Sequence, residues 1–196
     1  GKYDGEVNTN TTILQFDEDN VINDVLVAPK IKGECNQWLE MLIISKELLK
    51  KIVFDSQSRN KVSFTREILQ NKECGYKIMG YEHKGLFMRI DSSNSYHASN
   101  MMLLNAETRN ALFKYKTPVY TKVGDNPPVK YGIEANIKNS LIADGCIIEG
   151  EVENSIIFRN VKVARGTVVK NSIIMQNTVL GENSTLNCII ADKNVV

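Results

Sequence analysis

One short phrase recurs four times in the last third of the chain, and it constrains the fold more than any other feature. It consists of asparagine, a small residue and two aliphatic residues, and it occupies positions 139–142, 154–157, 171–174 and 187–190. Strand alternation places the small residue and the second aliphatic residue of each phrase on one face, with the asparagine and the first aliphatic residue on the other. An ordinary alternating sheet does not require such near-constant spacing, so the repeat favours a coil of stacked strands.

Further aliphatic residues follow the ends of these phrases at steps of six. The series are Ile142–Ile148, Ile157–Val163–Val169, Ile174–Leu180–Leu186 and Ile190–Val196. This spacing is typical of a hexapeptide β-helix, in which three flat sides form one coil and each inward residue stacks on its equivalent in the next coil.

The corners of this coil are expected at the repeated asparagines and at glycines, because both tolerate left-handed or tight backbone. The glycines concerned are Gly145, Gly150, Gly166 and Gly181. The steps from Ile148 to Val152 and from Leu186 to Ile190 are only four residues, so the corners are expected to differ in length.

The first 116 residues predict a mixed α/β region. We expect a hairpin over 11–27, a buried strand over 38–44, a helix capped by Ser45 and a shorter helix opened by Ser63 or Thr65. Strands are expected over 76–81 and 85–90, and a third helix over about 93–113. The predicted domains are therefore residues 1–116, a linker over 117–130 that contains Gly and Pro, and the β-helix over 131–196.

Composition excludes several classes of function. The formal net charge of +1 gives no reason to expect nucleic acid or an anionic membrane as a partner. No apolar run reaches membrane-spanning length and no signal peptide is recognisable before Tyr3, while a start at Gly1 without methionine suggests a processed or shortened chain. The four cysteines form no CxxC pair and are interpreted as reduced intracellular thiols, with Cys188 as small core filling in the slot that serine occupies in the other phrases.

Several stretches resemble the C-terminal half of the glucose-1-phosphate adenylyltransferase family, and in particular its GlgD-type regulatory subunits. They are residues 39–49, 85–104, 127–131 and, most specifically, the phrase Asn-Ser-Leu-Ile-Ala-Asp-Gly-Cys-Ile-Ile at 139–148. The resemblance implies the C-terminal half of a nucleotidyltransferase-like α/β domain followed by a single-stranded, left-handed parallel β-helix. It also implies a cytoplasmic protein of glycogen biosynthesis that forms homo- or hetero-oligomers with a catalytic subunit through the β-helix.

Two departures from the catalytic members of the family argue against turnover. Catalytic members carry Gly-Tyr-Trp-Arg-Asp-Val-Gly-Thr where this chain has residues 85–92, so Arg89 stands in the place of a metal-binding Asp. An arginine has no acceptor for a metal ion and repels it. The family's Glu-Lys-Pro sugar-phosphate triplet is replaced by Ala28-Pro29-Lys30, which loses the acid and displaces the lysine. A surface role is the simpler interpretation of Lys30.

The remaining polar residues do not assemble a site in the sequence. We interpret Asp17-Glu18-Asp19 as a hairpin turn, His83 and His97 as structural or solvated, and Asp144, Glu149, Glu151 and Glu153 as coil surface. Hexapeptide acyltransferases generally use a histidine within or beside the coils, and no histidine lies between 98 and 196. We therefore assign no catalytic, cofactor-binding or metal-binding residue to this chain, and we expect Mg²⁺ and ATP only in the family's catalytic subunit.

Three functions remain open at this point. The first is a regulatory, non-catalytic subunit of glucose-1-phosphate adenylyltransferase. The second is an active sugar-phosphate nucleotidyltransferase whose Gly-rich phosphate loop lies in a missing N-terminal half, because these residues contain no Gly-x-Gly cluster. The third is a β-helix scaffold without a ligand. In all three, these 196 residues alone are expected to bind nucleotide weakly or not at all.

Overall fold

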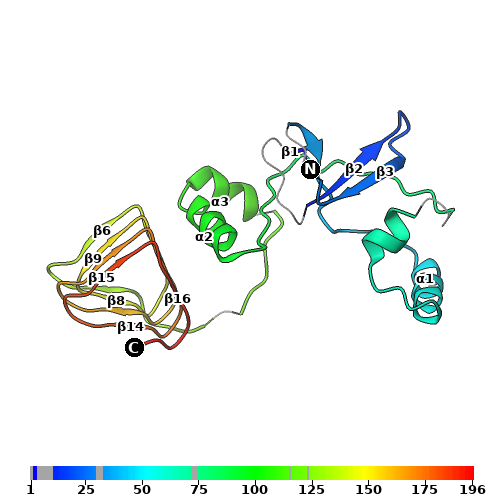
Figure 1. The fold of residues 1–196 in the computed structure, drawn as a ribbon. Coiled ribbons are helices and arrows are strands. Elements are labelled where there is room, and N and C mark those ends of the chain that lie inside the picture. Colours follow the sequence, from blue (N-terminus) through cyan, green and yellow to red (C-terminus); the bar gives the residue numbers. More distant parts are fainter. Residues whose placement is uncertain (1, 4–10, 30–32, 72–74, 115, 123) are drawn as a thin grey trace. The chain divides into compact units, whose positions relative to one another are not determined.

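The computed structural model describes residues 2–3, 11–29, 33–71, 75–114, 116–122 and 124–196. Its contacts divide the chain into two compact units, residues 1–85 and residues 86–196 (Figure 1). The division by contacts does not test the domain boundaries predicted at 116 and 130, which stay a prediction.

The predicted hairpin is present in the first unit. β2 (Thr12–Phe16) pairs antiparallel with β3 (Ile22–Val27), and a second short pair joins β1 (Lys2–Tyr3) to β4 (Cys35–Asn36). Asp17 shapes the hairpin turn, because its Oδ1 accepts the N–H groups of Asp19 and Val21 at 3.0 and 2.9 Å. The acidic turn thus has a local structural role, as predicted.

Two helical segments follow the hairpin. α1 (Lys46–Ser58) begins after Ser45, whose Oγ accepts the N–H of Leu48 at 3.3 Å, so the predicted cap is confirmed. η1 (Thr65–Leu69) is a short π-helical turn in which Ile68 and Leu69 are buried. Ser63 precedes it, and its Oγ accepts the N–H of Arg66.

Three of the expected strands are absent. Residues 38–44 form no strand and Ile43 is fully exposed, while 76–81 contributes only the isolated bridge between Val21 and Met79, and 85–90 forms no strand. Residues 76–81 do bond the hairpin, since Ile22 N–H donates to the carbonyl of Ile78 at 2.9 Å and Gly80 N–H to the carbonyl of Asn20 at 2.8 Å, but these bonds form no continuous ladder. The helix predicted over 93–113 is two helices, α2 (Ser93–Met102) and α3 (Ala106–Leu112), because Asn105 caps the second.

The predicted β-helix is confirmed as three four-stranded parallel sheets that form the sides of a prism (Figure 1). The first side contains β5 (Lys130–Tyr131), β8 (Ile147–Ile148), β11 (Lys162–Val163) and β14 (Val179–Leu180). The second contains β6 (Asn136–Lys138), β9 (Glu151–Glu153), β12 (Val168–Lys170) and β15 (Thr185–Asn187). The third contains β7 (Leu141–Ile142), β10 (Ile156–Ile157), β13 (Ile173–Ile174) and β16 (Ile190–Ala191). The left hand of the coil stays a prediction.

Stacked aliphatic residues fill the prism, and most of the residues that recur at steps of six point inward, as predicted. The buried core cluster consists of Cys146, Ile148, Val152, Ile157, Val161, Val163, Val169, Ile174 and Leu180. Burial of these side chains is the main source of stability for a coil whose strands are only two or three residues long.

The corner between the second and third sides contains a ladder of serines. Ser155 Oγ donates to the carbonyl of Glu153 at 2.7 Å and accepts the N–H of Ser172, one coil above, at 3.1 Å. Ser140 makes the same two bonds one coil below, and Ser172 Oγ accepts the N–H of Ile189. The serine of each of the first three phrases therefore accepts a backbone N–H of the coil above and donates to a carbonyl of its own corner.

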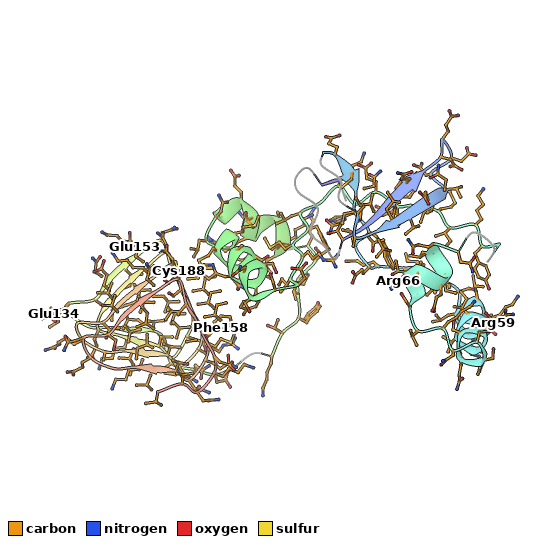
Figure 2. The ribbon with its side chains drawn as sticks, in the orientation of Figure 1. Arg59, Arg66, Glu134, Glu153, Phe158 and Cys188 are labelled. Atoms are coloured by element: carbon orange, nitrogen blue, oxygen red, sulfur yellow. The ribbon has the colours of Figure 1, made fainter. Side chains whose placement is uncertain are left out.

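The fourth phrase fits the coil one residue later than the sequence pattern suggests. Ile190 pairs with Ile173 and Ala191 with Ile174, so Ala191 is the inward residue. Cys188, with φ +56°, takes the left-handed corner that Asn139, Asn154 and Asn171 occupy below it. The predictions that Cys188 fills the serine slot and that Ile190 leads inward to Val196 are wrong. Cys188, labelled at a corner of the prism in Figure 2, is exposed, and so is Val196.

The corner between the first and second sides is uneven, because its second coil is short. Val152 follows Ile148 by a step of four positions, whereas Val169 follows Val163 by a step of six. Gly150 lies in the short corner, and a Cβ there would overlap the carbonyl oxygen of Thr167. Only glycine fits this close approach of two backbones.

Candidate functional site

Arg89, which the resemblance sets against a metal-binding Asp of catalytic members, lies just before Ser92, the N-cap of α2. Arg89 Nε lies 3.4 Å from Asp91 Oδ2, and both side chains are mostly buried. The hydroxyl of Ser95 donates to Asp91 Oδ1 at 3.1 Å, and Ser95 and Ser92 form a reciprocal capping box at the beginning of α2. The segment therefore satisfies its own charges and backbone groups.

This arrangement does not fit a divalent cation. Both carboxylate oxygens of Asp91 have partners, one the Arg89 guanidinium and the other the Ser95 hydroxyl. A cation placed there would meet the arginine's positive charge, and Mg²⁺ prefers carboxylates that are free to coordinate it. Across the described residues, no three His, Cys, Asp or Glu side chains gather in a way that could hold a metal ion.

The other residues singled out from the sequence lie apart from this segment. Lys30 falls outside the described residues, and His83 is exposed in a loop of the first unit. On the second side of the prism, Lys170 Nζ lies 3.1 Å from Glu153 and 3.8 Å from Glu151, and the hydrogen bond to Glu153, followed by the acids' charge, raises the pKa of Lys170. These acids pair with a lysine.

Asp144 fastens the entry segment to the coil. Its Oδ2 accepts the side-chain N–H of Asn126 at 2.7 Å and its Oδ1 lies 3.1 Å from Arg159 Nε. The hydrogen bond from Asn126, supported by Arg159, lowers the pKa of Asp144 below its ordinary value. This carboxylate serves the coil's structure.

His97 has a role that the sequence did not reveal. It extends from α2, and its Nε2 donates to the backbone carbonyl of Asn171 at a corner of the third coil, at 2.7 Å. That nitrogen is therefore unavailable as a general base, although the histidine lies beside the coil. The bond holds α2 against the β-helix within the second unit.

The side of the prism that begins at this corner carries an apolar outer ladder. Ile156 and Ile173 alternate with the inward Ile157 and Ile174, so they point out of the prism, yet both are buried. Because His97 ties α2 to the carbonyl of Asn171, two residues before Ile173, α2 is the element positioned to cover this ladder. The buried outer ladder could have been recognised in the sequence from the first aliphatic residue of each phrase, because a solvated face would carry polar residues at that position.

Comparisons with known proteins agree with this architecture. The family model described as GlmU-like, C-terminal hexapeptide matches residues 128–196. The glycogen biosynthesis protein GlgD of Bacillus subtilis is 41% identical over 159 residues, covering 81% of this chain and 46% of that protein. GlgD of Geobacillus stearothermophilus is 42% identical over 166 residues, covering 81% of this chain and 47% of that protein.

Proteins named as the enzyme glucose-1-phosphate adenylyltransferase also match this chain, at lower identity than the GlgD proteins. A glucose-1-phosphate adenylyltransferase of Clostridium perfringens is 30% identical over 171 residues, covering 85% of this chain and 43% of that protein. This chain is a relative of the GlgD proteins, as its sequence predicts. It spans just under half the length of the relatives that it matches, so the activity and partners of a whole GlgD-like protein are matters for proposal. None of the helices in the described part of the chain has the length and hydropathy needed to span a bilayer.

Proposed function

We propose that this chain is the C-terminal part of a GlgD-like regulatory subunit of glucose-1-phosphate adenylyltransferase, which contributes assembly and not turnover. The observation that carries the proposal is the Arg89–Asp91 ion pair, which takes the place of a metal-binding carboxylate. The higher identity to GlgD, 41–42% against 30% for the adenylyltransferases, supports it. The setting is glycogen synthesis in the cytoplasm, where the catalytic partner makes ADP-glucose from ATP and glucose 1-phosphate with Mg²⁺.

The β-helix supplies the surface for assembly. Its first coil consists of strands β5, β6 and β7. Each is the last strand of its sheet, so in the described part of the chain no further strand pairs with its outer edge. Tyr131 and Ile133 are exposed at this end, Ile133 fully. Unpaired strand edges beside apolar side chains favour packing against a neighbouring subunit.

The test is a steady-state assay of the complete gene product, alone and mixed with the catalytic subunit from the same genome. We expect no ADP-glucose formation by the gene product alone, a changed rate or substrate saturation on mixing, and co-migration of the two proteins in light scattering. A catalytic subunit inactivated at its metal site is the control, because it should abolish all turnover in the mixture. Turnover by the gene product alone, at a rate like that of a catalytic subunit, would refute the proposal.

The active nucleotidyltransferase remains the second candidate, since the phosphate loop of such an enzyme precedes the region that this chain matches. An intact Gly-rich loop with its basic residues in the complete gene would favour it. The ligand-free scaffold is separated by calorimetry of the complete product with ATP, glucose 1-phosphate and sugar-phosphate effectors. Binding of any of them argues against a plain scaffold.

A further inference from the structure

The first side of the prism carries an alternation of positive and aliphatic side chains on its outer surface. Strand register places Lys130, Ile147, Lys162 and Val179 in one outward column, with one residue each from β5, β8, β11 and β14. The residue that follows each of the last three lies in the buried core, so the column itself faces out of the prism. Ile147 and Val179 are 37% and 39% exposed, and both lysines are exposed. We call these four residues the first-side column.

The lysines of the first-side column have no anionic partner in the described part of the chain. Lys130 and Lys162 make no ion pair there, and the residues directly beside Lys162 in the column are Ile147 and Val179. Adjacent strands of a sheet lie about 4.8 Å apart, so two strand spacings set the lysines about 10 Å apart at the backbone. The column therefore presents two positive charges on either side of an aliphatic residue.

The other two sides of the prism lack this combination. On the second side, Lys170 Nζ lies 3.1 Å from Glu153, and Lys138 is the neighbour of Glu153 in the strand below. On the third side, the outward Ile156 and Ile173 are already buried, and α2 is tied next to them. The first side thus retains both charge and apolar surface for a partner.

We propose that the first-side column is a docking surface for an acidic and partly apolar surface of the catalytic subunit. Two carboxylates of the partner would lie against the lysines, and an aliphatic side chain would pack between them against Ile147. This inference rests on the proposed function, because it takes the catalytic subunit as the partner. The column begins on β5, a strand at the open end of the coil, so the two surfaces are continuous.

Charge favours this partner over a second copy of the chain. A two-fold contact between two copies of the first side would bring four lysines together with no carboxylate in either column. Like charges across an interface oppose association, whereas opposite charges fix the register and speed the encounter. Carboxylates opposite the lysines, with Ile147 and Val179 buried beside them, match both features of the column.

The experiment measures the dissociation constant between the complete gene product and the catalytic subunit from the same genome by analytical ultracentrifugation. Lys162→Glu in the gene product should raise this constant at least about tenfold, because a carboxylate would then face a carboxylate. Lys138→Glu is the matched control, since Lys138 is also an exposed lysine of the coil but lies on the second side, and we expect less than about a twofold change. Added salt should weaken the native complex more than the Lys162→Glu complex, because it screens an attraction that the variant lacks.

The outcomes distinguish failure of this surface from failure of the regulatory role. A complex that the two variants affect alike, or that neither weakens, would overturn the first-side column as a docking surface and leave the regulatory role standing. Absence of any complex between the native proteins would refute both. An oligomer of the gene product alone that Lys162→Glu dissociates and Lys138→Glu does not would overturn the proposal in favour of a second copy.

Discussion

Replacing Ser155 with alanine removes the central rung of the serine ladder. The side chain is fully buried, and its loss leaves the N–H of Ser172 without its acceptor, whereas the carbonyl of Glu153 keeps the N–H of Asn171 as a donor at 3.1 Å. An unsatisfied buried polar group costs about 1–3 kcal/mol, so we expect a loss of about 1–3 kcal/mol in the free energy of unfolding of the coil.

The single tryptophan, Trp38, lies in the first unit, so its fluorescence does not report on unfolding of the coil. The measurement has to follow the coil itself. Native-state hydrogen exchange of the amides in 168–175 meets this need. Ser140→Ala is the matched control: Ser140 makes the same two bonds in the first coil but is only half-buried, so we expect a loss of about 1 kcal/mol or less. Equal losses for the two variants would show that burial does not set the strength of the ladder.

Three further predictions concern the β-helix. Ile174→Ala should destabilise the coil by about 2–5 kcal/mol in urea unfolding followed by circular dichroism, whereas Ile133→Ala should have almost no effect, because Ile174 is fully buried and Ile133 fully exposed. Cys188→Asn should stabilise the coil by roughly 0.5–1 kcal/mol, since asparagine adopts the left-handed corner more readily, and an unchanged or lower urea midpoint would contradict this. Because its pKa is lowered in the folded chain, Asp144 stabilises the fold at pH values above the ordinary carboxyl pKa, and this contribution is lost as the pH falls through the lowered folded value. Asp144→Asn lacks this contribution at every pH. Below about pH 4, the urea midpoint of Asp144→Asn should therefore fall less than that of the native chain.

The coil could be predicted because its information is local and repeated. Each inward residue of the series from Ile157 to Val169 recurs at a fixed step, and the first asparagine of each of the first three phrases marks a left-handed corner. The placement of Cys188 could not be predicted in the same way. Asn187 completes the visible phrase, but the strand register places Ala191 above Ile174, so the fourth coil begins its corner one residue later. Packing of the inward residue decided the register, and the resemblance between phrases did not.

The first unit was predicted less well, because its strands depend on partners distant in sequence. The hairpin over 11–27 is closed by its own turn and was foreseen, whereas the run at 38–44 forms no strand in the described part of the chain, and its apolar pattern does not identify a pairing partner. Of the functional positions, Arg89 was found from the resemblance, but its pairing with Asp91 and Ser95 was visible only in the structure. The contact between His97 and Asn171 joins residues 74 positions apart and left no local signal.

The short corner at Gly150 bears on how the coil finds its correct stacking order. A β-helix whose turns were all of one length could slip by a whole turn and still bury similar aliphatic residues. If the turns of this coil slipped by one turn, the four-residue step from Ile148 to Val152 would stack on different turns from those it meets in the native coil. Gly150 would then no longer lie beneath the carbonyl of Thr167. Glu134 and Arg165, from the coils below and above this corner, pair at 3.5 Å and would also be separated. The short turn thus makes one stacking register lower in free energy than the registers displaced by a whole turn.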